Sequence, residues 1–124
     1  MKWLNRDLIV GPYLVLCRSE SEFHRVMKHC NVPRDKCGNW IGEGSDARTH
    51  ELSNAEGQQV AVVCINATTQ HPCQIASLLV HEAVHVWQFH CDRIGERNPS
   101  SEFEAYSIQS IAQRLLFAFA ETVT

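Results

Sequence analysis

One uninterrupted stretch constrains the fold more than any other part of this 124-residue sequence, because no glycine and no further proline occur between Pro72 and Gly95. Glycine and proline are the residues that helix interiors disfavour most. Apolar residues fill the stretch, namely Ile75, Leu78, Leu79, Val84, Val86 and Phe89. The pattern predicts one long helix with several buried faces, from residue 72 to about residue 93, inside a single small domain.

The first half of the chain predicts a strand, a helix and a β-hairpin. Residues 8–17 are apolar and β-rich, too few to span a bilayer, and predict a buried strand rather than an export signal. A Ser-x-x-Glu capping box opens residues 19–30, which predicts the first helix. Residues 49–53 and 59–66 flank a turn and predict a hairpin, whose second strand is almost wholly apolar and therefore central.

The end of the chain predicts one more helix. Gly95 indicates the end of the long helix and Pro99 the approach to a new one. Ser100 or Ser101 can cap this last helix, which runs through Phe119. Its expected inward residues are Phe103, Ile108, Ile111, Leu115 and Leu116. The expected fold class is therefore α+β, one domain over residues 1–124: an N-terminal helix, a small and mostly antiparallel sheet, and two adjacent C-terminal helices.

Three titratable residues interrupt the long apolar helix. His81 and His85 are four positions apart and so lie on one face, one turn from each other. Two imidazoles placed in this way can bind one Zn²⁺ ion at about 2.0–2.1 Å from each nitrogen. Glu82 is rotated from His81 by about 100°, which places its carboxylate beside the ion, where a base for water belongs. The alternative is a pair of core histidines with ordinary hydrogen bonds, but burying three ionisable groups without an ion would be strongly unfavourable.

A catalytic zinc site needs a third protein ligand and an open fourth position. Cys91 and His90 follow on the same helix, but they lie off the face that carries His85 and its partner. The next helix begins Ser-Glu-Phe-Glu-Ala-Tyr, and an acidic residue in its first turn, Glu102 or Glu104, can face the histidines. These two glutamates are about 200° apart on a helix, so only one of them can be the ligand.

The motif His81-Glu82-x-x-His85, followed by a glutamate on a later helix, resembles the gluzincin metallopeptidases, and in particular small phage- or prophage-encoded minimal gluzincins. In several of those families the ligand glutamate begins a run Glu-x-x-Ala-Asp. The run from Glu102 to Tyr106 looks like it, with tyrosine in place of the last aspartate. The resemblance covers roughly residues 75–115 and implies a minimal zincin-like fold with Glu102 as the third ligand. It also implies that Tyr106 orients a ligand histidine or stabilises the oxyanion.

The expected activity is zinc-dependent hydrolysis of a peptide or protein substrate, with Zn²⁺ on His81, His85 and Glu102. Glu82 is the expected general base, and Tyr106 or a loop histidine such as His50 or His71 the expected oxyanion partner. An edge strand at residues 49–53 can pair with an extended substrate. The alternative is a catalytically silent, zinc-stabilised binding protein that acts in phage–host interference, because so short a chain leaves little material for cleft walls.

Charge and cysteine content restrict the expected partners and the expected cellular compartment. The net charge is −3, and lysines and arginines form no basic stripe, so neither nucleic acid nor an anionic membrane surface is an expected partner. The six cysteines lack tight spacing, and with no export signal they predict reduced thiols in a cytoplasm, such as that of a bacterial host. Three disulfides in a secreted domain are the alternative.

Overall fold

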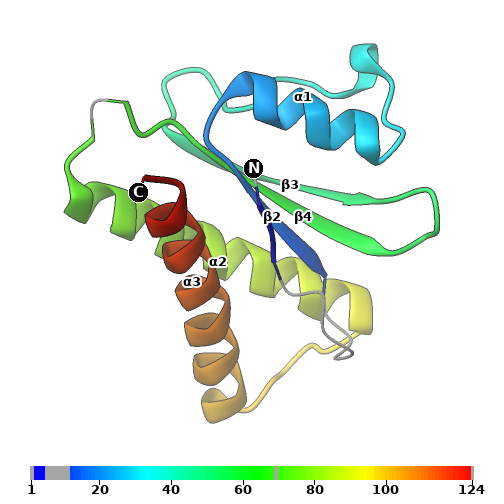
Figure 1. Cartoon of the computed structure of the whole chain (residues 1–124). Helices are drawn as coiled ribbons and strands as arrows, with labels where there is room; N and C mark the ends of the chain where they lie inside the picture. The colour runs from blue at the N-terminus through cyan, green and yellow to red at the C-terminus, as the bar shows by residue number, and fades with distance from the viewer. Residues whose placement is uncertain (1, 5–11, 69, 124) are drawn as a thin grey trace.

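The computed structural model describes residues 2–4, 12–68 and 70–123 of the chain. In chain order its elements are β1 (Lys2–Leu4), β2 (Tyr13–Cys17), α1 (Glu20–His29), the 3-10 helix η1 (Arg34–Lys36), β3 (Ala47–Ser53), β4 (Gln59–Ile65), α2 (Pro72–Ile94) and α3 (Ser101–Val123). Figure 1 shows α1 on one face of the sheet and α2 and α3 on the other. The predicted α+β class is confirmed. No helix in the described ranges is both long enough and apolar enough to cross a bilayer.

The sheet is mixed and has the strand order β1-β2-β4-β3. The β3–β4 hairpin is antiparallel, as predicted, and β1 also pairs antiparallel with β2. The central pairing of β2 with β4 is parallel, because α1 and β3 intervene in the chain and return β4 in the direction of β2. Strand β4 is thus interior, which explains its continuous apolar sequence.

Two hydrophobic cores lie on opposite faces of the sheet. Successive side chains of β2 and β4 point to opposite faces, so both strands contribute to both cores. Val15, Val60 and Val62 pack with Phe23, Val26 and Met27 of α1. The intervening residues of the same strands, Leu14, Leu16, Ala61, Val63 and Ile65, pack with α2 and α3. The sheet therefore separates an α1 side from an α2/α3 side, and the side chain of each β3 residue faces one side or the other.

Helix α1 begins as the capping box predicts. The Ser19 hydroxyl oxygen accepts a hydrogen bond from the backbone N–H of Glu22 at 3.2 Å, and the Glu22 carboxylate accepts one from the backbone N–H of Arg18 at 2.7 Å. Both bonds satisfy N–H groups near the helix start. The predicted first strand corresponds to β2, which begins at Tyr13. The part of the prediction that covers residues 8–11 lies outside the described residues.

Helix α3 buries fewer of the predicted residues than expected. Leu115 is fully buried, and Ile108 and Ile111 are half-buried. Phe103 and Leu116, in contrast, are exposed, and their prediction as inward residues was wrong. The core on this side takes its α3 residues from the second half of the helix, around Ala112, Leu115 and Ala118, whereas Phe103 lies in the first turn and contacts only the edge of Trp87 among the rings described.

All six cysteines are free, in agreement with the prediction of reduced thiols. Cys17, Cys30, Cys37 and Cys64 are buried in the core on the α1 side. Cys17 and Cys64 are paired positions on β2 and β4, and their hydrogen bond, together with burial, raises the pKa of the Cys64 thiol far above its usual value. The four buried cysteines are therefore packing residues of this core.

Candidate metal centre

His81 and His85 converge, as their spacing predicts. Their Nε2 atoms are 3.1 Å apart and their ring centroids 4.8 Å apart. Two nitrogens at about 2.0–2.1 Å from a tetrahedral zinc ion would be about 3.3–3.4 Å from each other. Both side chains are exposed on α2, so an ion can approach from solvent. The separation of the two nitrogens fits one shared divalent cation.

Gln88 orients the second imidazole. Its Oε1 lies 3.1 Å from His85 Nδ1, so it accepts a hydrogen bond from a protonated Nδ1 and leaves the lone pair of Nε2 free. Partners of this kind fix the tautomer of metal-binding histidines. Gln88 is exposed and still makes this hydrogen bond. Its position three residues after His85, on the same helix face, was the available signal.

Glu82 is the one buried charged residue in the part of the chain that the structure describes, with 4% of its surface exposed. The Thr49 hydroxyl of β3 donates a hydrogen bond to Glu82 Oε1 at 2.8 Å. Thr49 pairs with Val63 in the hairpin and therefore faces α2. Helix α2 and strand β3 thus hold the carboxylate between them. Its position next to His81 in the sequence is the one predicted for a base.

Strand β3 contributes a second carboxylate on the same side. Glu51 pairs with Ala61, which belongs to the core under α2 and α3. Partial burial raises the pKa of the Glu51 carboxyl, the Asp92 carboxylate raises it further, and the His85 imidazole lowers it. Among the two histidines, His85 is the one whose charge influences Glu51. Sequence reasoning missed both Thr49 and Glu51, although polar residues at alternate positions of a strand next to the active helix were a usable signal.

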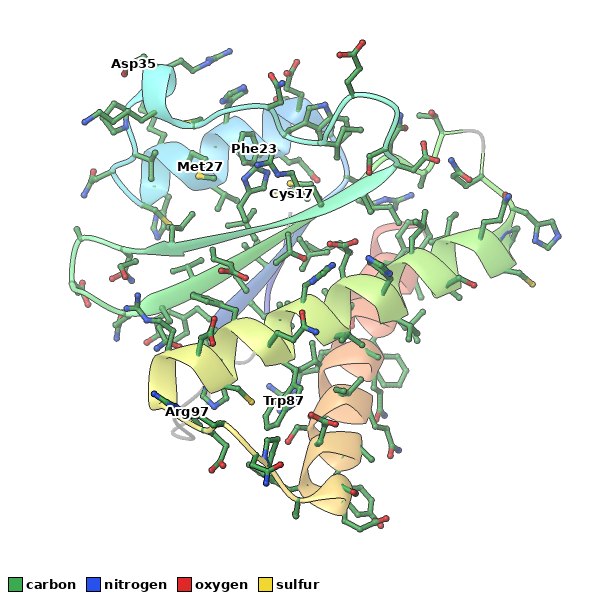
Figure 2. All side chains as sticks on the ribbon, turned by 180° about the vertical axis from the view of Figure 1, so that it is seen from behind. Cys17, Phe23, Met27, Asp35, Trp87 and Arg97 are labelled. Carbon is green, nitrogen blue, oxygen red and sulfur yellow. The ribbon has the colours of Figure 1, made fainter. Side chains whose placement is uncertain are left out.

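The first turn of α3 lies against the other flank of α2. Trp87 Nε1 donates a hydrogen bond to Glu104 Oε2 at 3.0 Å, so Glu104, the alternative ligand, is an exposed hydrogen-bond partner of α2 on the Trp87 side. Trp87 is about 200° around the helix from His85. Glu102 and Tyr106 are exposed, Tyr106 to 67%. Figure 2 shows Trp87 between α2 and α3.

No three histidine, cysteine, aspartate or glutamate side chains among the described residues form a group that could hold a metal. Two of the three predicted ligands, His81 and His85, are brought together, and Glu102 is not grouped with them. Its role as ligand stays a prediction, and so does the role of Tyr106. Cys91 and His90 lie off the histidine face, as expected: the nearby Glu104 contributes to the raised pKa of Cys91, and the ring of His90 is near Trp87.

The two histidines considered as oxyanion partners lie elsewhere. His71 is the N-cap of α2, where its Nδ1 accepts a hydrogen bond from the backbone N–H of Cys73 at 3.0 Å, and it precedes His81 by about 15 Å of helix. His50 pairs with Val62 and faces α1, on the opposite side of the sheet from Glu82. Its ring lies 4.6 Å from that of Phe23, and its Nε2 donates to the Trp40 carbonyl at 2.9 Å.

The environment of His50 predicts a loss of stability in acid. Burial lowers the pKa of His50, so the folded chain favours the neutral imidazole and the unfolded chain binds more protons below about pH 6.5. The free energy of unfolding should therefore fall as the pH drops from 7.5 to 5.5. His50→Gln retains a donor for the Trp40 carbonyl and removes the titration, so urea unfolding at both pH values should show a smaller fall for this variant. Equal falls would contradict the assignment.

Comparisons of the chain with protein-family models, with curated proteins and with solved structures find no match.

Proposed function

We propose that this chain is a zinc-dependent peptidase of the gluzincin type, with His81 and His85 as two zinc ligands and Glu82 as the general base. The observation that carries the proposal is the 3.1 Å separation of the two Nε2 atoms. The carboxylate of Glu82, the residue after His81, is held in place by Thr49. Zinc would supply Lewis-acid activation of water and of the substrate carbonyl. Glu82 would accept the proton of the attacking water and deliver it to the leaving amine.

The remaining roles come from the resemblance of the sequence to gluzincins. It supplies Glu102 as the third ligand and Tyr106 as a partner of a ligand histidine or of the oxyanion. The packing of α3 on the Trp87 side of α2 adds no support for either role. The minimal zincin-like architecture is likewise part of the proposal, supported by the order of α2, a turn and α3 along the chain.

An extended peptide is the substrate that the surroundings favour. Within the described residues β3 pairs only with β4, so its outer edge offers backbone N–H and C=O groups for β-augmentation. A hollow of about 360 Å³ opens on the α1 side of this edge, between β3 and the segment that includes η1, with Met27, Lys36 and Leu52 in its lining. A second hollow of about 360 Å³ is lined by Gln74, Ser77 and Leu78, on the α2 face that continues to His81. The second hollow could hold a substrate side chain next to the histidine pair.

One observation favours the alternative, a zinc-stabilised binding protein without catalysis. Glu82 is only 4% exposed and is engaged by Thr49, which limits its access to substrate and water. The same experiment separates the two functions, because a binding protein would retain zinc without cleaving peptides.

The proposal predicts zinc-dependent cleavage that depends on the histidine pair. The purified chain with equimolar zinc should cleave an unstructured protein such as casein, a chelator should stop cleavage, and added zinc should restore it. His85→Ala should lower the rate by more than about 100-fold, since it removes a ligand. His29→Ala, which changes an exposed histidine of α1, is the matched control and should retain activity. Cleavage that survives both the chelator and His85→Ala would refute the peptidase.

A further inference from the structure

We propose that Glu51 of β3 supplies the third protein ligand to the His81–His85 pair, so that the ion is bound between α2 and the edge strand rather than between α2 and α3. The inference rests on the proposed function for the metal and for the two histidine ligands. It replaces the carboxylate that the sequence resemblance implies with one that the fold places on the histidine side of α2.

Two hydrogen bonds fix how β3 runs along α2. Thr49 Oγ1 donates to Glu82, and further along both elements Arg93 donates to Ser53 Oγ at 3.3 Å. The strand and the helix therefore advance in the same direction. Glu51 lies about 6.6 Å beyond Thr49 along the strand, and His85 lies about 4.5 Å beyond Glu82 along the helix. Glu51 and His85 are thus at the same level to within about 2 Å.

The rotation of α2 places the histidines at the β3 rim. Glu82 contacts β3 directly. Measured as rotation about the axis of α2 from Glu82, and away from the core, His85 lies at about 60° and His81 at about 100°. Trp87, which contacts α3 through Glu104, lies about 140° from Glu82 in the opposite sense. The histidine pair therefore lies beside β3, and the first turn of α3 is on the far flank.

Side-chain chemistry fits the assignment. Glu51 faces α2 but is exposed, so its long side chain can rotate toward the two Nε2 atoms, a movement that binding requires because the described side chains do not form a group of three ligands. The Asp92 carboxylate raises the pKa of the Glu51 carboxyl and the His85 imidazole lowers it, in keeping with the level of Glu51 along α2. Asp92 is about 10 Å beyond His85 along the helix, too far to share the ion. Two histidines and one glutamate form a known catalytic zinc set.

Zinc affinity, measured by competition with a chromophoric chelator, tests the assignment without recourse to activity. Glu51→Gln should raise the zinc dissociation constant by more than about 100-fold, because even outer-shell partners of metal ligands are worth about 10–100-fold. Glu56→Gln, in the exposed hairpin turn, is the matched control and should stay within about threefold of the unmodified chain. Glu102→Gln tests the competing ligand that the resemblance implies, and binding through Glu51 predicts no loss of zinc affinity in it. The d–d absorption of the Co²⁺-substituted chain should change in Glu51→Gln alone. Thermal unfolding without metal should be the same for all three variants, which shows that the fold is intact.

The outcomes distinguish this inference from the function on which it rests. If Glu102→Gln weakens zinc binding and Glu51→Gln does not, the β3 ligand is wrong and the peptidase proposal stands with the ligand set of the resemblance. If the unmodified chain binds zinc no more tightly than His81→Ala, both proposals fail. Loss of affinity in Glu51→Gln alone supports the site between α2 and β3.

Discussion

Glu82→Gln is expected to abolish hydrolysis while the chain continues to bind zinc. The amide has nearly the same shape as the carboxylate and can still accept the hydrogen bond from Thr49, so α2 and β3 should remain in place. It cannot accept the proton of the attacking water, and positioned general bases contribute about 10²–10⁴-fold to such reactions. We therefore expect a fall in kcat of at least about 100-fold, measured on the zinc-loaded variant.

The control is Glu96→Gln, which makes the same chemical change at an exposed position just after α2. It should cleave at the rate of the unmodified chain and bind the same amount of zinc. If Glu82→Gln retains more than about one tenth of the activity, its carboxylate is not the base. If it loses zinc as well, the residue acts on the metal or on the fold.

Phe23→Ala is expected to have the largest effect on stability. Phe23 is fully buried in the core on the α1 side, and its ring lies 4.6 Å from that of His50. Removing a buried phenylalanine side chain loses its transfer free energy and leaves a cavity, a combined effect of about 3–5 kcal/mol. Since a domain of this size is stable by about 5–15 kcal/mol, the variant should unfold at a much lower urea concentration.

Phe117→Ala provides a matched comparison, because the same atoms are removed from a side chain of α3 that is 60% exposed. Its free energy of unfolding should stay within about 0.5 kcal/mol of that of the unmodified chain. Equal destabilisation by the two substitutions would mean that the division into a buried α1 side and an exposed surface of α3 is wrong.

Local sequence patterns were sufficient to predict the three α-helices and the β3–β4 hairpin, but they did not predict β1 or η1. The Ser-x-x-Glu box located the start of α1, and the glycine- and proline-free stretch located α2, which ends at Ile94 before Gly95 in a left-handed conformation. The spacing of His81 and His85 predicted their convergence, because a helix fixes the relation of residues four apart without any tertiary contact.

The errors concern contacts between distant segments. The parallel pairing of β2 with β4 depends on how the chain returns after α1, which no short pattern encodes. Phe103 and Leu116 were predicted to face the core because all of α3 was assumed to cover it. Only the second half of α3 does so. Thr49 and Glu51 were missed because their relation to α2 requires the register of the hairpin and the direction of β3 along the helix.

The central claim, that His81 and His85 bind one divalent cation, is tested most directly by crystals of the zinc-loaded chain measured at the zinc absorption edge. The account predicts one strong anomalous peak at about 2.0–2.1 Å from Nε2 of both histidines. A peak at another place on the chain, or imidazoles that point apart around no peak, would contradict it.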